Sequence, residues 1–360
     1  MLSAKDLKEK FDIEFARGKS GLNVGLPMPF SLLSSEVCGI QQGRYDLWMG
    51  SIGSGKSTVV QEGYISYPIQ YCEKYKDSIP FTYEVDYFNL EIPDVNVMAK
   101  LLANWIYKES KGAVKVSVNK IFQKGTNKLT ADEVEWITKS YKYLDFLLQH
   151  CNFITGEGIS EKYVYKRLIE LAKKHGTMEV NAQGAELLYT YKPKDPNKFI
   201  MVVFDNVNNL NSKELIDKCS SIFVKFRNNC KFSFSIVQQY NRNQEANDRE
   251  FMEPQIGDGK DSGLPGQDCD TAFLTYIPAR FGLTEYKQYM LNQGYNGSKK
   301  KLGDFFRMVK LAKNRDGQDN IYLPYAFNGA AGIVKELVSP SDWKENKNRC
   351  KDYYFQHFGN

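Results

Sequence analysis

The sequence predicts an α/β protein whose central sheet is mainly parallel and flanked by helices. The first observation is that short apolar segments alternate with longer helical stretches along most of the chain. The second is a glycine-rich segment at residues 50–58, placed between a strand pattern and a helix pattern. The third is size, because 360 residues of which 42% are hydrophobic can bury one large domain with insertions, or two smaller domains.

Residues 1–17 are predicted to form a short helix. Leu7, Phe11 and Phe15 recur at intervals of four residues and therefore fall on one face of this helix. Such a narrow apolar stripe needs a partner, which is either the rest of the same domain or an adjoining subunit. Residues 18–44 contain several glycines and two prolines, so we expect an irregular lead-in to the first strand.

Seven segments have the composition of buried strands. Such strands are typical of a parallel sheet whose connecting helices cover both faces. A helix is also expected directly after the glycine-rich segment, at residues 56–65. The expected strands are residues 45–49, 81–88, 199–204, 232–237, 271–276, 305–311 and 321–327.

The interval 94–175 is predicted to be a predominantly helical insertion. Thr130 followed by Glu133 has the pattern of a capping box, and Ser160 precedes a second helix start. Residues 189–196 are polar and contain two prolines, so we expect a turn there.

The composition limits the class of protein. Forty-eight Lys and Arg against 43 Asp and Glu give a net charge of +5, so a polyanion would be bound by a local stripe or by a ring of subunits. The seven cysteines form no C-x-x-C pair and the three histidines are scattered, which argues against a zinc site, a disulfide framework and a His-dependent hydrolase.

No apolar run approaches the ~20 residues of a membrane span and no signal-peptide pattern is present. A cytoplasmic protein is expected, and the richness in Lys, Asn, Tyr and Ile is compatible with a phage in a bacterial host.

Residues 50–58, G-S-I-G-S-G-K-S-T, match the full phosphate-loop (Walker A) pattern G-x-x-x-x-G-K-[ST]. Glycines let backbone N–H groups turn toward phosphates without a Cβ clash. Lys56 is expected to reach the β- and γ-phosphates, and the Ser57 hydroxyl to ligate Mg²⁺. The alternative, a Gly/Ser surface loop, is disfavoured by the flanking strand and helix. The predicted cofactors are ATP and Mg²⁺, and the predicted binding residues are Gly50, Gly53, Ser54, Gly55, Lys56, Ser57 and Thr58.

Three polar residues follow predicted strands, as nucleotide hydrolysis requires. Asp205 ends an apolar strand and suits the support of Mg²⁺, although an apolar strand followed by Asp is common without this role. Glu91 lies just after strand 81–88, where a carboxylate either polarises the attacking water or is solvated surface. Gln239 ends strand 232–237 and suits sensing of the γ-phosphate, which is a weak signal by itself.

In this order, these motifs resemble the C-terminal RecA-like ATPase domain of the DnaB-type replicative helicases. The resemblance extends from about Gly18 to Leu337. It implies a RecA-like P-loop NTPase domain at 18–338, a linker-type helix at 1–17 and a tail at 339–360, without the family's N-terminal collar. The matching segments are F-N-L-E-I-P at 88–93 for F-S-L-E-M-P, Q-Y-N-R at 239–242 for Q-L-N-R, 260–270 for R-E-S-G-x-I-E-Q-D-A-D, and K-N-R-D-G at 313–317 for K-x-R-N-G.

The resemblance implies roles in hydrolysis for four residues. Glu91 would be the catalytic glutamate, and Gln239 would be the γ-phosphate sensor. Lys313 and Arg315 would reach into the nucleotide of the neighbouring subunit, where an arginine finger is typically worth ~10³–10⁵ in rate. From the residues alone, Arg315 could equally belong to a surface hairpin turn.

The resemblance also implies DNA contacts and partners. The start of segment 260–270 would be a channel loop that grips single-stranded DNA, which nominates Lys260, Asp261 and Gly263. Cations in residues 243–266 are offset by acidic residues, so a regulatory or disordered loop is the alternative interpretation. The implied assembly is a homo-oligomeric ring, expected to be a hexamer, that hydrolyses ATP, translocates on single-stranded DNA and meets a primase or helicase loader.

Two departures from the family pattern concern the contacts with a primase or loader and the channel loops, and they leave the hydrolytic residues intact, while two other functions stay open. Residues 206–210 read N-V-N-N-L where the family has Y-L-Q-L, and Pro265 and Gly266 replace Ile and Glu. One alternative is a RecA- or KaiC-like oligomeric ATPase that binds DNA or partner proteins without unwinding. The other is a structural nucleotide-binding protein without turnover.

Overall fold

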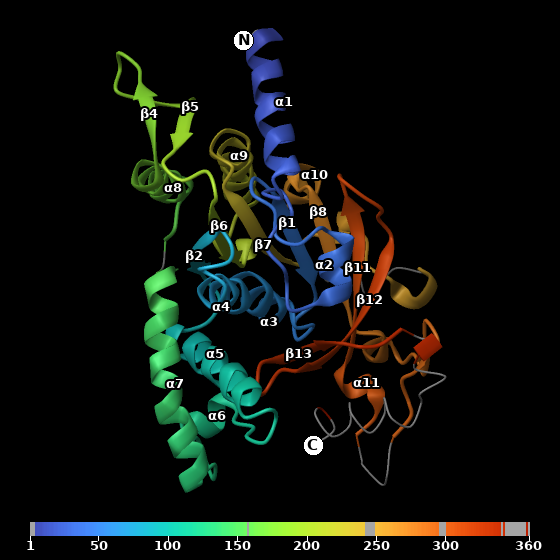
Figure 1. The fold of residues 1–360 in the computed structure, drawn as a ribbon. Helices are drawn as coiled ribbons and strands as arrows, with labels where there is room; N and C mark the ends of the chain where they lie inside the picture. Colours follow the sequence, from blue (N-terminus) through green and yellow to red (C-terminus); the bar gives the residue numbers. More distant parts are fainter. Residues whose placement is uncertain are drawn as a thin grey trace.

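The computed structural model describes residues 4–156, 158–241, 249–294, 300–339, 341–342 and 358. A nine-stranded sheet lies at its centre, with strands in the order β13-β12-β11-β8-β1-β7-β6-β2-β3 (Figure 1). The six strands from β8 to β3 are parallel, and β11, β12 and β13 are antiparallel. The prediction of a mainly parallel sheet is confirmed. The strands are β1 (Tyr45–Gly50), β2 (Thr82–Asn89), β3 (Cys151–Ile154), β6 (Lys198–Asp205), β7 (Ser233–Gln239), β8 (Thr271–Tyr276), β11 (Phe306–Asn314), β12 (Ile321–Asn328) and β13 (Ile333–Glu336).

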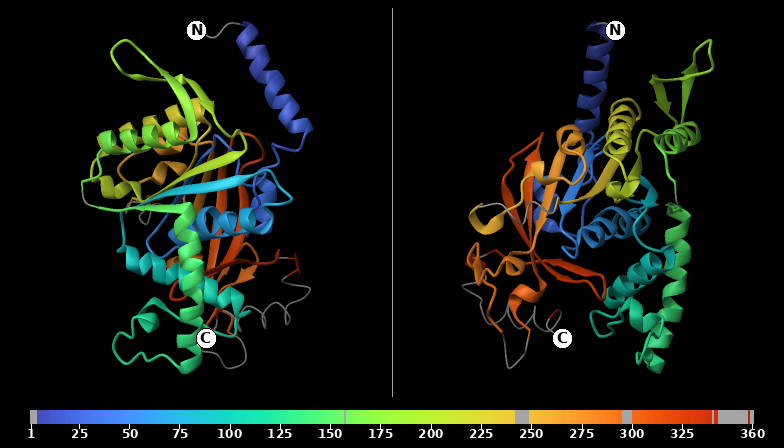
Figure 2. Two further views of the ribbon diagram at one scale, coloured as in Figure 1. Left: turned by 60° about the vertical axis from the view of Figure 1, so that its left-hand side comes forward. Right: turned by 180° about the vertical axis from the view of Figure 1, so that it is seen from behind.

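Helices cover both faces of this sheet (Figures 1 and 2). The helices of one face are α3 (Lys56–Val60), the π-helical turn η1 (Gln61–Ser66), α4 (Tyr67–Lys74), α5 (Asp94–Glu109) and α7 (Ala131–His150), and those of the other are α8 (Glu161–His175) and α9 (Lys213–Cys230). The shorter elements are α2 (Ser31–Glu36), α6 (Val118–Ile121), η2 (Val207–Leu210), η4 (Glu250–Met252), η5 (Ile256–Asp258), α10 (Leu264–Asp268), η6 (Pro278–Phe281), α11 (Leu302–Phe305) and the β9–β10 hairpin (Glu285–Tyr286, Tyr289–Met290).

Strand β1 shows why the core strands have mostly apolar sequences. Its side chains alternate between two cores, with Trp48 in the core beneath α3 to α7 and Leu47 and Met49 in the core beneath α8 and α9. All three side chains are buried. Because both faces of the strand are covered, its pattern is mostly apolar, and its one charged residue, Asp46, is buried and paired with Arg44 at 2.9 Å.

Two predicted helix starts are confirmed. The Thr130 hydroxyl accepts a hydrogen bond from the Glu133 N–H, and the Glu133 carboxylate accepts one from the Thr130 N–H, which completes the capping box at the start of α7. Ser160 caps α8 by accepting from the Tyr163 N–H.

Three sequence expectations need correction. Residues 18–44 include helix α2, and the largely helical interval 94–175 also contains the edge strand β3. The predicted turn at residues 189–196 is wrong for residues 189–193, because β5 (Glu186–Pro193) pairs there with β4 (Gly176–Val180) and packs on α9, and the turn begins only after Pro193. A four-residue strand and a polar hairpin are too short for a period to identify them, and contacts distant in sequence stabilise both.

The N-terminal helix α1 (Ala4–Lys19) extends away from the body of the molecule (Figures 1 and 2). Leu7, Phe11 and Phe15 are 56%, 67% and 60% exposed, so the described part of the domain does not cover the apolar stripe. At the base of α1, Arg17 donates to the side chains of Asn197 and Gln42. No helix in the described residues combines the length and apolarity needed to cross a bilayer. Most of the predicted tail, Arg242 of the Q-Y-N-R segment, and residues 243–248 lie outside the described residues.

Candidate nucleotide-binding site

The glycine-rich segment forms a tight loop between the end of β1 and the start of α3. Gly53 and Gly55 have φ angles of 76° and 90°, which side-chain-bearing residues rarely adopt. Glycine is needed at position 50 for a different reason, because a Cβ atom there would overlap the Thr275 hydroxyl. The described loop therefore needs glycine at all three positions, as a phosphate cradle does.

Lys56 places a buried ammonium group inside this loop. Its Nζ donates to the carbonyl oxygens of Gly50 and Ser51, at 2.8 and 2.9 Å. Burial lowers the pKa of Lys56 to about 8, while the nearby carboxylates of Asp205 and Glu91 raise it. None of the described carboxylates lies within ion-pair distance of Nζ. A buried cation in a cradle of backbone amides fits an anionic ligand such as a nucleotide phosphate.

Asp205, at the end of β6, lies against the start of α3. The Ser57 hydroxyl donates to its Oδ1 at 3.1 Å, and the Tyr87 hydroxyl donates to its Oδ2 at 3.2 Å. Burial raises the pKa of Asp205 to about 6, and the charge of Glu91 adds to this rise.

These two groups also fit Mg²⁺. A hydroxyl beside a buried carboxylate is the oxygen donor set that Mg²⁺ uses when phosphates and water supply its other ligands. In the described part of the chain no group of three or more His, Cys, Asp and Glu side chains could hold a metal by itself. Ser57 and Asp205 are therefore the residues that would hold Mg²⁺ together with a bound nucleotide.

We expect the Asp205→Asn variant to be more stable than wild type near pH 8, by about 3 kcal/mol in unfolding free energy, as a carboxyl pKa of about 6 instead of 3.8 implies. The carboxyl group of Asp205 binds its proton more tightly in the native state than in the unfolded chain. The free energy of unfolding of the wild type therefore falls as the pH rises through about 6 and this proton is lost. The advantage of the variant should shrink toward pH 5 in urea unfolding. A lower free energy of unfolding for the variant than for wild type at both pH values would contradict a raised pKa of Asp205.

Glu91 and Gln239 lie at the same edge of the sheet as the loop, here called the carboxyl edge, where the parallel strands end. Gln239 is the register partner of Gly50, and Asp205 pairs with Asn89 at the end of β2. Glu91 follows two residues later and is exposed, and its Oε2 accepts a hydrogen bond from the Asn206 amide at 2.7 Å. The structure thus brings both predicted residues near Lys56.

Lys260, Asp261 and Gly263 follow β7 and also lie near the carboxyl edge. The Lys260 N–H donates to the Gln239 carbonyl at 2.8 Å, and the Gln238 amide donates to the carbonyl oxygens of Lys260 and Ser262. The side chains of Lys260 and Asp261 are exposed. Lys260 and Asp261 also lie within ion-pair distance of each other, at 3.9 Å. A loop with a hydrogen-bonded backbone and exposed charged side chains beside the γ-phosphate sensor position can contact a second ligand.

Lys313 and Arg315 lie at the opposite edge of the sheet, because β11 runs antiparallel to β8. The Lys313 ammonium donates to the carbonyl oxygens of Gly266 and Gln267, at 3.0 and 2.8 Å. Arg315 pairs with Asp270 at 3.0 Å, and its side chain is 45% exposed. The structure therefore does not bring these residues to the phosphate loop of their own chain.

Sequence reasoning missed three residues beside the loop. Arg280 donates to the Ser51 hydroxyl at 3.0 Å and to the Ile52 carbonyl at 2.8 Å. The Phe327 ring lies against Gly55, and the Arg307 guanidinium lies 5.4 Å from its centre. Burial and the charge of Arg280 lower the pKa of Arg307 to about 10. The strand pattern places Phe327 in β12, but no local signal shows that the end of β12 reaches the loop.

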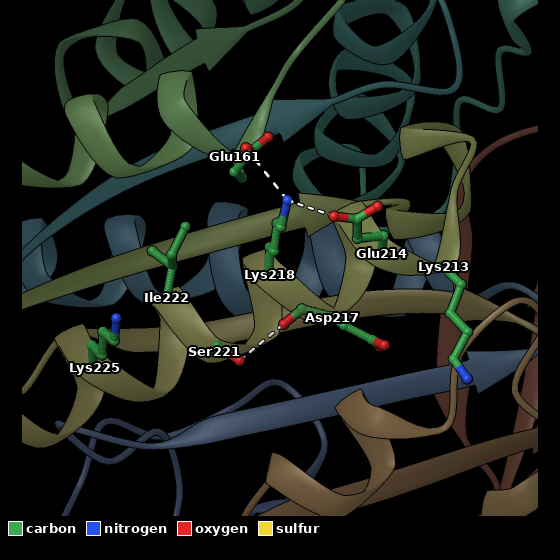
Figure 3. Close-up of a pocket in the computed structure, with 8 residues that line it drawn as sticks. All are labelled: Glu161, Lys213, Glu214, Asp217, Lys218, Ser221, Ile222 and Lys225. Atoms are coloured by element: carbon green, nitrogen blue, oxygen red, sulfur yellow. Dashed lines mark hydrogen bonds and ion pairs between the residues drawn. The ribbon is translucent and has the colours of Figure 1, made fainter.

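Two of the surface hollows away from the phosphate loop bear on the assignment. Arg315 lines a hollow of about 650 Å³ together with Arg44, Arg227 and Asp270, at the edge opposite the phosphate loop. A shallow hollow along α9 contains none of the predicted site residues, and its Lys218 lies between Glu214 and Glu161 (Figure 3). Because that cation is already paired, the α9 hollow is a poor site for an anion.

Comparison with known proteins gives matches in structure only. No family model and no curated protein sequence matches the chain. The ATPase domain of a phage helicase superposes with a TM-score of 0.66 and 16% identity, covering 94% of this chain and 100% of that chain. A DnaB-like replicative helicase, described with its interactions with primase, superposes with a TM-score of 0.63 and 15% identity, covering 91% of this chain and 65% of that chain. The predicted resemblance to the RecA-like ATPase domain of DnaB-type helicases is confirmed for the fold.

Proposed function

We propose that the chain is an ATP-hydrolysing subunit of a DnaB-like helicase, which assembles into a ring, expected to be hexameric, and translocates on single-stranded DNA. The division of the site between two edges of one sheet carries this proposal. Lys56, Ser57 and Asp205 gather at the carboxyl edge, whereas Arg315 lies exposed at the opposite edge. One subunit can therefore offer a cradle to its own nucleotide and an arginine to that of the next subunit, a head-to-tail contact that closes into rings.

Within one subunit, the proposed reaction uses the carboxyl edge. Lys56 binds the terminal phosphates, and Glu91 accepts the proton of the attacking water. Gln239 is placed to contact the γ-phosphate. Mg²⁺, held through Ser57 and Asp205, would neutralise phosphate charge when the nucleotide is bound.

The adjoining subunit completes the proposed site. Its Arg315 and Lys313 would stabilise the negative charge that develops on the transferred phosphoryl group. The exposed stripe of α1 supports a linker-type role, in which this helix docks on a neighbour. Both contacts require assembly, so we expect the monomer to hydrolyse ATP poorly.

Single-stranded DNA is the proposed polymer, and the loop that holds Lys260, Asp261 and Gly263 is its proposed contact. A loop that offers backbone amides and few cations follows sugar–phosphate spacing and not base identity. A primase or helicase loader is the further partner class that the family resemblance adds.

The base of the nucleotide is proposed to stack on Phe327, beside Arg280. We expect Phe327→Leu, which keeps the side chain apolar, to weaken ATP binding by about 10-fold, since stacking on an aromatic ring is worth ~1–3 kcal/mol per base. Equilibrium binding of a fluorescent ATP analogue measures the change. Phe122→Leu is the matched control, because Phe122 is an exposed ring in the helical insertion. Equal affinities for the two variants would remove Phe327 from the site.

A forked-duplex assay tests the function itself. We expect ATP-dependent strand displacement by wild type and none by Glu91→Gln, which retains ATP binding. Nucleotide-dependent assembly on DNA or protein without displacement would favour the RecA- or KaiC-like alternative. Absence of ATP hydrolysis at high protein concentration with single-stranded DNA would favour the structural nucleotide-binding alternative.

A further inference from the structure

The turn that follows β6 carries three asparagines, Asn206, Asn208 and Asn209. Asn206 is 0% exposed and Asn208 is 5% exposed, although amide side chains are mostly found at protein surfaces. Val207 and Leu210, in the same turn, are buried in the core beneath α8 and α9. The turn is therefore a rigid element, and its buried amides need partners.

Asn206 makes one contact and leaves one atom unpaired. Its Nδ2 donates to Oε2 of Glu91 at 2.7 Å, which sets the orientation of that carboxylate. Its own Oδ1 is buried and has no hydrogen-bond partner. Leaving a buried acceptor without a hydrogen bond costs free energy. A change at the site can therefore readily move the Asn206 side chain.

Asn208 uses the whole of its amide. Its Oδ1 accepts from the Gln239 N–H at 2.7 Å, and its Nδ2 donates to the Lys260 carbonyl at 2.8 Å and to Oδ2 of Asp261 at 3.0 Å. A side chain bound on three sides cannot keep its place if the loop around Lys260 and Asp261 moves.

We propose that this turn couples the Lys260–Asp261 loop to the catalytic glutamate, with Asn208 and Asn206 as the positioning residues at its two ends. The inference rests on the proposed function and adds its regulation. When single-stranded DNA occupies the loop, the bonds to Asn208 change, the turn shifts, and the Asn206 amide releases or reorients Glu91. The same connection transmits nucleotide binding back to the loop, because coupling between two sites is reciprocal.

Asn208→Asp is the sharpest variant. The carboxylate keeps an acceptor for the Gln239 N–H, loses both donors and repels Asp261. We expect basal kcat and the KM for ATP to stay within about twofold, while stimulation by oligo-dT falls at least about 5-fold, the lower end of typical coupling. Asn208→Ala should show the same loss.

Asn209→Ala is the matched control for the loop end of the turn, because the Asn209 amide lies in the same turn but donates to the Leu90 carbonyl, whereas the Asn208 amide donates to Lys260 and Asp261. We expect it to retain the ratio of stimulated to basal kcat. Equal loss of stimulation in Asn209→Ala and Asn208→Asp would mean that the turn acts only as structure and would refute the coupling.

Hydrogen–deuterium exchange distinguishes a failure of the proposed coupling from a failure of the proposed nucleotide binding. With ADP and beryllium fluoride, wild type should show protection at residues 53–58 and a change at residues 259–263, and Asn208→Asp should keep the first and lose the second. Protection at 53–58 without a change at 259–263 in wild type, or the same change in the variant, would refute the coupling alone. No protection at 53–58 would refute nucleotide binding, and the coupling with it.

Discussion

Arg315→Ala is expected to lower the ATPase rate of the assembled protein by at least about 10³-fold, because an arginine supplied in trans stabilises charge in the transition state by that order. The side chain is held in place by Asp270 and by the Gln267 carbonyl, yet it remains 45% exposed. It is therefore fixed toward the outside of its own subunit. Steady-state ATP hydrolysis at a protein concentration that maintains the oligomer measures the effect.

ATP affinity is the control for this prediction. The phosphate loop of the same chain lies at the other edge of the sheet, so Arg315→Ala should change the Kd for ATP by less than about threefold, far below the rate effect. Arg315→Lys keeps the charge and loses the planar fork, so its rate should fall between those of wild type and Arg315→Ala. Wild-type turnover in Arg315→Ala would exclude the residue from catalysis.

Lys56→Ala is expected to weaken ATP binding by about 10²–10³-fold, since removing one partner of a buried charge contact costs about 2–5 kcal/mol. The ammonium group is buried and held by two backbone carbonyls, so it points into the loop before any ligand arrives. Isothermal titration with Mg²⁺ and a non-hydrolysable ATP analogue measures the loss. Lys231→Ala is a suitable control, because Lys231 is an exposed lysine paired with Glu14 on α1.

An unchanged affinity in Lys56→Ala would contradict the nucleotide site itself. The thermal unfolding of both lysine variants should be compared in the absence of nucleotide. A folded Lys56→Ala protein that does not bind ATP is the expected result.

The parts of the fold that the sequence predicts well are those where local chemistry and tertiary burial agree. Strand β8 occupies the predicted residues 271–276 because its side chains are buried on both faces, which favours a short, mostly apolar and aromatic segment. The capping box of Thr130 and Glu133 is equally local. The phosphate loop is found because its motif is contiguous in sequence, and because the positive φ angles of Gly53 and Gly55 are a local requirement for glycine.

The parts that the sequence does not predict depend on contacts between distant segments. Phe327 and Arg280 meet the phosphate loop from strands and turns more than 200 residues away, and neither belongs to a motif. Asn206 and Asn208 are visible in the sequence only as a departure from the family pattern. Their contacts with Glu91 and the Lys260–Asp261 loop arise from the alignment of β2, β6 and β7 at one edge.

The central proposal is that two adjoining chains build each nucleotide site. The two edges of the sheet carry complementary halves, with the cradle and Asp205 at one edge and Arg315 at the other. The positions of these halves follow from the antiparallel direction of β11 relative to β8. A protein that worked as a monomer would need an additional cation at the carboxyl edge, and Arg280, which donates to Ser51 and Ile52 of the loop, is one described residue placed to supply it.

Mixing two inactive variants tests this proposal most directly. Lys56→Ala lacks a working cradle and Arg315→Ala lacks the arginine, so each alone should hydrolyse ATP poorly. In mixed assemblies, an intact cradle from the Arg315→Ala chain meets an intact arginine from the Lys56→Ala chain. We expect ATPase activity to reappear in the mixture and to peak at intermediate ratios. No recovery at any ratio, with mixed oligomers demonstrated by mass spectrometry, would show that the site is not shared between subunits.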